Sequence, residues 1–228
     1  MKRGVMMVVL LLAATGLFAR SVGGGISVFV PESAFRFAEG SLSVESSLET
    51  SLSMGDYIRF PLGVSYNQIY GLVPQGGDIK PDHPWLYADS LMPYLGVKAR
   101  IPAGKMYFDL FGGGAVNWNP IVRPLTKNIE DDVADAVGAS GGISFTESIT
   151  AKAPFGYGWL AGGAVGVRIQ DISVDINATY RHIYHKLEVS GDYEELGGSG
   201  STGTYESKDG LRAMLRGLAI GIHGSFSF

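Results

Sequence analysis

The chain has 228 residues, of which 33 are Gly, 46% are hydrophobic, 18% are charged and none is Cys. The glycine content is too high for a helical protein, and the hydrophobic content is too high for a disordered chain. The lack of Cys excludes disulfides, thiolate metal sites and cysteine nucleophiles. The net charge of −4, with Lys and Arg scattered along the chain, argues against nucleic-acid binding.

The first 19 residues have the pattern of a secretory signal peptide. Lys2 and Arg3 precede the apolar run 5–12, and the small residue Ala19 suits the position before a cleavage site. We predict a signal peptide over residues 1–19 and one domain over 20–228; an uncleaved membrane anchor is the alternative. No later segment has 18 apolar residues in a row, so the exported chain is either soluble or crosses a membrane as strands.

Periods of two along the rest of the chain predict eight strands. These strands cover residues 22–30, 41–54, 57–72, 91–101, 105–118, 156–169, 172–189 and 211–228. Short turns at 55–56, 102–104 and 170–171 alternate with long loops at 31–40, 73–90, 119–155 and 190–210. Residues 128–137, in the longest loop, can form a short acidic helix.

An even strand count with short turns on one side and long loops on the other is the layout of bacterial outer-membrane barrels. One face of strand 172–189 is apolar and the other is polar: Ile172, Val174, Ile176, Ala178 and Tyr180 lie opposite Ser173, Asp175, Asn177, Thr179 and Arg181. A soluble barrel such as a lipocalin also alternates, but eight strands leave too little interior space for so many large apolar residues. We therefore predict an all-β fold, an eight-stranded antiparallel up-and-down transmembrane β-barrel with its apolar face toward lipid.

Aromatic residues near the predicted strand ends are expected to lie at the membrane interface, where amphipathic rings favour the headgroup layer. These residues are Tyr66, Trp118, Trp159, Tyr180, Phe226 and Phe228. The chain also ends in mid-strand at Phe228, which resembles the C-terminal signature that the barrel insertion machinery recognises. Outer-membrane lipid and this machinery are the partners that the pattern implies.

The inward parity of each strand predicts the contents of the lumen. A charge network is expected toward the short-turn end, where opposite charges in a narrow space should pair. Its members are Glu45, Glu49, Arg59, Lys98, Arg100, Asp109, Arg168 and Asp175. An apolar upper lumen is expected toward the long loops, formed by Phe29, Ile69, Leu160 and Ile183. This apolar part is either an entrance for apolar ligands or ordinary packing in a plugged barrel.

The sequence offers little support for a metal, a cofactor or catalysis. His182 and His185 would lie on opposite faces of one strand, and His223 is a lone inward histidine. The acidic run Glu130, Asp131, Asp132 and Asp135 lacks the spacing of a calcium-binding loop. We predict no metal, no cofactor and no enzymatic activity.

Residues 156–167, with the sequence GYGWLAGGAVGV, and the long strand after them resemble the OmpW family of small outer-membrane barrels. This resemblance implies a narrow barrel in the bacterial outer membrane that admits small hydrophobic molecules and releases them sideways into the membrane. No gating residue is carried over. The predicted function is a narrow channel for small hydrophobic solutes; the alternative is a surface-exposed binding or adhesion protein whose long loops contact host or environmental partners.

Overall fold

The computed structural model describes residues 20–32, 43–75, 81, 83–197, 200–207 and 211–228, without the side chains of residues 68–70 and 75. The predicted signal peptide lies outside the described residues. Among the described residues, no helix is long and apolar enough to cross a bilayer.

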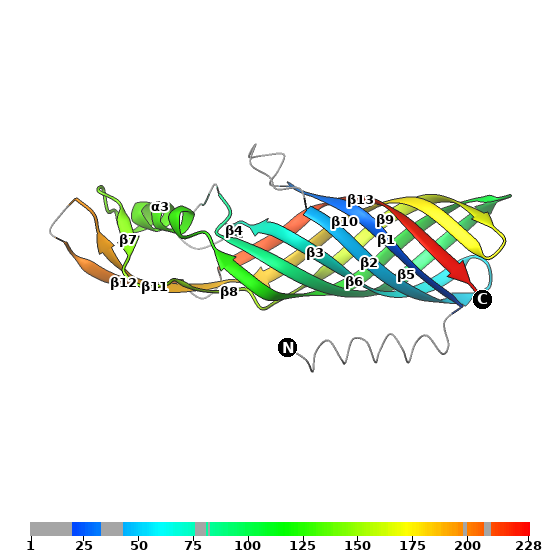
Figure 1. Ribbon diagram of the computed structural model, residues 1–228, viewed down its shortest axis with the longest axis horizontal. Helices are drawn as coiled ribbons and strands as arrows, with labels where there is room; N and C mark the ends of the chain where they lie inside the picture. The colour runs from blue at the N-terminus through cyan, green and yellow to red at the C-terminus, as the bar shows by residue number, and fades with distance from the viewer. Residues whose placement is uncertain (1–19, 33–42, 76–80, 82, 198–199, 208–210) are drawn as a thin grey trace.

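Eight strands form a closed antiparallel barrel, which confirms the predicted fold (Figure 1). The strands are β1 (Ser21–Pro31), β2 (Ser43–Met54), β3 (Ile58–Leu72), β5 (Leu86–Ala103), β6 (Met106–Pro124), β9 (Phe155–Ile169), β10 (Ile172–Lys186) and β13 (Arg212–Ser227). Each strand pairs with the next in this order, and β1 closes the barrel on β13 from Ser21 opposite Ser227 to Pro31 opposite Gly217. The two-residue strand β4 (Pro74–Gln75) adds to the end of β13.

The period of two in the sequence becomes an apolar exterior and a polar interior. On β10, Ile176 points outward with 64% of its surface exposed, whereas its neighbour Asp175 is buried. The same alternation places Leu110 outside and Asp109 inside on β6. A β-strand turns successive side chains to opposite faces. The barrel therefore exposes large apolar side chains on its outer surface and buries polar ones inside.

Three short turns join β2 to β3, β5 to β6 and β9 to β10, as predicted. Gly55 and Gly104 both adopt a φ of 67°, a conformation that glycine accepts without strain. Gln170 adopts a φ of 56° in the third turn, the one described residue other than glycine with a positive φ. These turns lie at the same end of the barrel as the C-terminus (Figure 1).

Two barrel strands extend further than the sequence pattern indicated. Strand β5 begins at Leu86 instead of residue 91, and β6 continues to Pro124 instead of residue 118. The pairing of these strands shifts register between Asp89 and Leu91. A bulge of this kind interrupts the alternation of apolar and polar residues. The sequence pattern therefore did not predict the part of the two strands beyond the bulge.

The predicted loops at 119–155 and 190–210 contain ordered secondary structure. They form α3 (Thr126–Val137), β7 (Ile143–Phe145), β8 (Thr150–Lys152), β11 (Glu188–Glu195) and β12 (Thr202–Glu206). Strand β11 pairs with β12 on one edge and with β7 and β8 on the other. We call residues 125–154, 187–197 and 200–207 the extension; it projects beyond the barrel at the end opposite the C-terminus (Figure 1).

The apolar core runs without a break from the outer half of the barrel into the extension. Its members include Phe29, Leu160 and Ile183 in the barrel, and Ile129 and Val133 on α3. Helix α3 ends at Gly138, whose φ of 74° is the left-handed conformation common after a helix. The extension is thus packed onto the barrel mouth rather than tethered to it.

Candidate functional site

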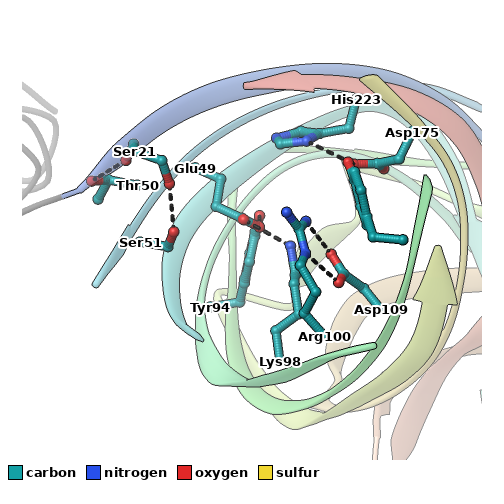
Figure 2. Close-up of polar contacts among 11 residues, drawn as sticks. Ser21, Glu49, Thr50, Ser51, Tyr94, Lys98, Arg100, Asp109, Asp175 and His223 are labelled. Carbon is teal, nitrogen blue, oxygen red and sulfur yellow. Dashed lines mark hydrogen bonds and ion pairs between the residues drawn. The ribbon is translucent and has the colours of Figure 1, made fainter. Parts of the chain in front are cut away.

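The half of the lumen nearest the short turns contains a dense polar cluster (Figure 2). Arg100 on β5 donates two hydrogen bonds to Asp109 on β6, at 2.8 and 2.7 Å, and both side chains are buried. The Arg100 guanidinium also lies 3.5 Å from the centre of the Tyr107 ring. The Tyr107 hydroxyl donates to Asp175 on β10 at 2.9 Å, and His223 Nδ1 lies 3.6 Å from the same carboxylate. Strands on opposite sides of the lumen are therefore linked through their side chains.

Two further ion pairs cross the middle of the lumen. Lys98 donates to Glu49 at 2.9 Å, and the Tyr94 hydroxyl donates to the same carboxylate at 3.0 Å (Figure 2). Arg181 Nη2 lies 2.5 Å from the Glu45 carboxylate, in a pair that is almost fully buried. A buried charge without a partner costs several kcal/mol, and the pairing of these side chains offsets that cost.

The outer half of the lumen contains the predicted apolar residues. Phe29, Leu160 and Ile183 are buried, with 1%, 3% and 0% of their surfaces exposed. The side chain of Ile69 lies outside the described residues. Phe29 packs against the Arg181 guanidinium, and Phe29, Leu160 and Ile183 all belong to the core that continues beneath the extension. These three side chains therefore fill the mouth of the barrel and do not line an open entrance.

A polar network that the sequence did not predict lies beside this apolar packing. His185 is 1% exposed, and its two ring nitrogens lie 3.2 and 3.3 Å from the side-chain amide nitrogens of Asn117 and Asn119. Ser90 donates to Asn117, and Asn119 donates to the carbonyl oxygen of Ala153 at 2.6 Å. The upper lumen is therefore not wholly apolar.

Two predicted members of the charge network lie at its margin. Arg168 is exposed beside the turn and donates to the carbonyl oxygen of Gln170 at 3.1 Å. Arg59 is half-buried and lies opposite Ser53 and Lys98 in the neighbouring strands. Both residues have inward parity, but the barrel opens to solvent at its last strand residues. Parity alone does not distinguish this rim from the lumen.

An interior cavity of about 90 Å³ lies between the ion pairs. Glu45, Glu49, Lys98 and Arg181 line it together with apolar residues such as Leu160. Some buried polar atoms of the residues that line it, among them Arg181 Nε and Ser65 Oγ, have no hydrogen-bond partner within the described protein. A cavity of this size holds several water molecules, which can bond to these polar atoms.

Trp85 closes the mouth of the barrel. Its side chain is fully buried, and its indole nitrogen donates to Asp132 on α3 at 2.5 Å. The ring of Tyr205 on β12 packs edge-on against it, with centroids 6.5 Å apart. Burial raises the pKa of the Tyr205 hydroxyl to about 12. Because Glu130 on α3 also accepts a hydrogen bond from the backbone of Phe145, helix, sheet and barrel mouth form one packed unit.

Four of the six predicted interface aromatics fall into two groups. Trp159 lies 5.7 Å from Tyr180 and stacks on His182 at 5.6 Å, on the part of the barrel toward the extension. Phe226 and Phe228 lie 6.4 Å apart at the end with the short turns. Tyr66 and Trp118 are half-buried on β3 and β6.

Several lumen residues were left out of the predicted charge network although their parity indicated an inward position. Arg181 was assigned to the polar face of Asp175 but not to the network, and Tyr94 shares the inward parity of Lys98. Tyr107 shares the parity of Asp109 in the same way. Within the part of the chain that the structure describes, no group of three or more His, Asp or Glu residues is placed to hold a metal ion.

The fold and the site together define a closed eight-stranded antiparallel β-barrel with an apolar exterior and an ordered extension at one mouth. Its interior is polar toward the short turns and mainly apolar toward the extension. No protein-family model matches the chain, and no curated protein matches it. Among solved structures, a major outer membrane protein from Thermus thermophilus is similar, with a TM-score of 0.43 and 12% identity over 91% of this chain and 98% of that one. Outer membrane protein W from E. coli is also similar, with a TM-score of 0.34 and 12% identity over 92% and 98%.

Proposed function

We propose that this protein is a bacterial outer-membrane barrel that holds the extension at the cell surface. The exterior supports the membrane location: Ile176, Ile222 and Leu110 each expose more than 60% of their surface on the middle of the barrel. A closed barrel satisfies all backbone hydrogen bonds between its strands, as a structure within hydrocarbon must.

The dimensions of the exterior agree with a bilayer. On β10 the outward residues from Ile172 to Tyr180 are apolar. Eight steps of about 3.3 Å at a strand tilt of about 40° give a height of roughly 20 Å, close to the apolar band of such barrels. Phe226 lies opposite Ile172, and Trp159 packs on Tyr180, so aromatic rings flank the band at both ends.

The observation that favours an anchor over a channel is the closed mouth. Trp85, Leu86 and Ile183 are fully buried where a solute would have to enter. Below them the Glu45–Arg181 pair crosses the lumen, and the Arg100–Asp109 pair lies along its wall between neighbouring strands. Opening such a lumen requires separating the buried Glu45–Arg181 pair.

A narrow passage for small hydrophobic solutes is the second candidate. It is favoured by the apolar part of the cavity lining, which includes Met92, Phe111 and Leu160. A solute taking this route would displace the core beneath Trp85 and leave between strands. The second candidate therefore predicts a structural change at the mouth, whereas the anchor does not.

Planar-bilayer recording on the refolded full chain separates the two candidates. The anchor predicts no conductance steps, with or without an apolar solute, from protein shown to be inserted by its resistance to SDS until boiled. A variant in which Trp85 is replaced by Ala serves as the comparison, since it loosens the mouth and leaves the barrel strands intact. Steady conductance of the unmodified chain, or solute uptake into vesicles that contain it, would support the passage and contradict the anchor.

A further inference from the structure

Strand β12 lies at the edge of the sheet in the extension, with one side paired and the other side free. The strand pairs with β11 from Thr202 opposite Glu194 to Glu206 opposite Ser190. Within the described residues, no other strand pairs with β12. An unpaired strand edge presents backbone donors and acceptors to any extended chain that approaches it.

The hydrogen bonds to β11 show which backbone groups point outward. The amide of Ser207 donates to Val189, and Ser201 accepts from Glu195, so the odd-numbered residues face β11. In an antiparallel ladder the residues between them turn their N–H and C=O groups the other way. Thr202, Thr204 and Glu206 therefore direct their backbone groups toward solvent, and all three are exposed.

Strand β12 is short and ends in the charged residue Glu206, but it has no Lys, Pro or bulge along its edge. Natural edge strands carry Lys, Pro or a bulge that prevents another strand from adding. Strand β12 has the sequence TGTYE and pairs with β11 without a register shift. Packing of Tyr205 against the buried Trp85 also holds the strand in place, which lowers the entropic cost of adding a partner.

The surroundings of the edge are strongly acidic. The extension contains ten Asp and Glu residues and two Lys, a net charge of −8 in a chain whose total is −4. Residues 187–197 and 200–207 contribute five of the acids and no Lys or Arg. Asp192, Glu194 and Glu206 are exposed on the β11–β12 hairpin. The field at the edge thus attracts cationic segments and repels anionic ones.

We propose that the free edge of β12 binds an extended basic peptide segment of a partner protein by strand addition. Main-chain hydrogen bonds to Thr202, Thr204 and Glu206 supply the attachment, and basic side chains at alternate positions of the peptide meet the acidic face. A second copy of this chain is a poorer occupant, because pairing two β12 edges brings together two extensions of charge −8. The proposal identifies the partner of the surface extension and to that extent rests on the proposed function.

The probe is a labelled ten-residue peptide of alternating Thr and Lys, and its binding to the refolded full chain in uncharged detergent is followed by fluorescence anisotropy. The same peptide with Glu in place of Lys should not bind. Thr204→Pro removes one outward N–H without touching the ladder to β11, and it should weaken binding at least about tenfold. Thr204→Ala loses the same side-chain hydrogen bond to Asp192 but keeps the N–H, so this matched control should bind as the unmodified chain does.

A peptide methylated on alternate backbone nitrogens provides the same test without altering the protein, and it should also bind at least about tenfold more weakly. Equal binding of the methylated and unmethylated peptides would show attraction by charge alone and overturn strand addition. Absence of Lys-peptide binding, or a dimer of the chain that Thr204→Pro abolishes, would overturn the choice of partner. Because binding is measured in detergent, its failure would leave the membrane orientation of the extension untouched.

Discussion

The Arg100–Asp109 pair allows a quantitative test of the polar lumen. Replacing Arg100 with Leu leaves the Asp109 carboxylate, whose side chain is 1% exposed, without its bidentate partner. Breaking a buried pair in this way costs about 3 to 5 kcal/mol, and loss of the contact with the Tyr107 ring adds to it. The equilibrium constant for unfolding should therefore rise by roughly two to four orders of magnitude.

The double variant Arg100→Leu/Asp109→Leu separates pairing from packing. Both charges are then absent and the volume is similar, so its stability should lie within about 1 kcal/mol of the unmodified chain or exceed it. Reversible urea unfolding in lipid vesicles, followed by tryptophan fluorescence, measures both variants. If the double variant is as unstable as Arg100→Leu alone, the loss comes from disturbed packing and the interpretation of the lumen as a set of paired buried charges is wrong.

Two further predictions address the exterior and the mouth. Ile222→Arg should lower the free energy of unfolding by about 2 to 4 kcal/mol in the same vesicle assay, because Ile222 is 61% exposed on the predicted lipid face. Ser225→Thr on the inner face should change stability only slightly. Equal stability of the two variants would show that the assignment of the faces is wrong. Trp85→Ala should cost about 3 to 5 kcal/mol in packing between extension and barrel. Limited proteolysis should then cut the extension faster while the barrel keeps its resistance to SDS, and unchanged cleavage would refute the role assigned to Trp85.

Alternation predicted the barrel because a lipid-facing strand repeats one simple pattern. Strands β9 and β10 carry mainly apolar residues outside, whereas the inside residues are mostly Gly and Ala on β9 and mostly polar on β10. The bounds of both strands at the turn end were therefore predicted closely. The charge partners were harder to predict. Glu45 and Arg181 lie 136 residues apart, and their pairing depends on the stagger of strands across the lumen, which no local pattern records.

The extension could not be predicted from alternation. Strand β12 and the end of β11 lie among Gly, Ser and Thr residues that resemble a flexible loop. Their order depends on tertiary contacts: Tyr205 packs on Trp85, and Tyr193 packs on Phe145. Trp85 itself lies in a segment interrupted by prolines, where no regular period marks it as buried. Only the helix α3 gave a local signal.

The orientation of the barrel is the central claim, and the lack of Cys in the chain makes it directly measurable. Thr204→Cys on the extension and Asp171→Cys at the β9–β10 turn are both exposed positions at opposite ends of the molecule (Figure 1). A maleimide that does not cross membranes should label Thr204→Cys on intact cells, and it should reach Asp171→Cys only after the outer membrane is opened. Labelling of Asp171→Cys on intact cells, with Thr204→Cys protected, would place the extension inside and contradict its role at the cell surface.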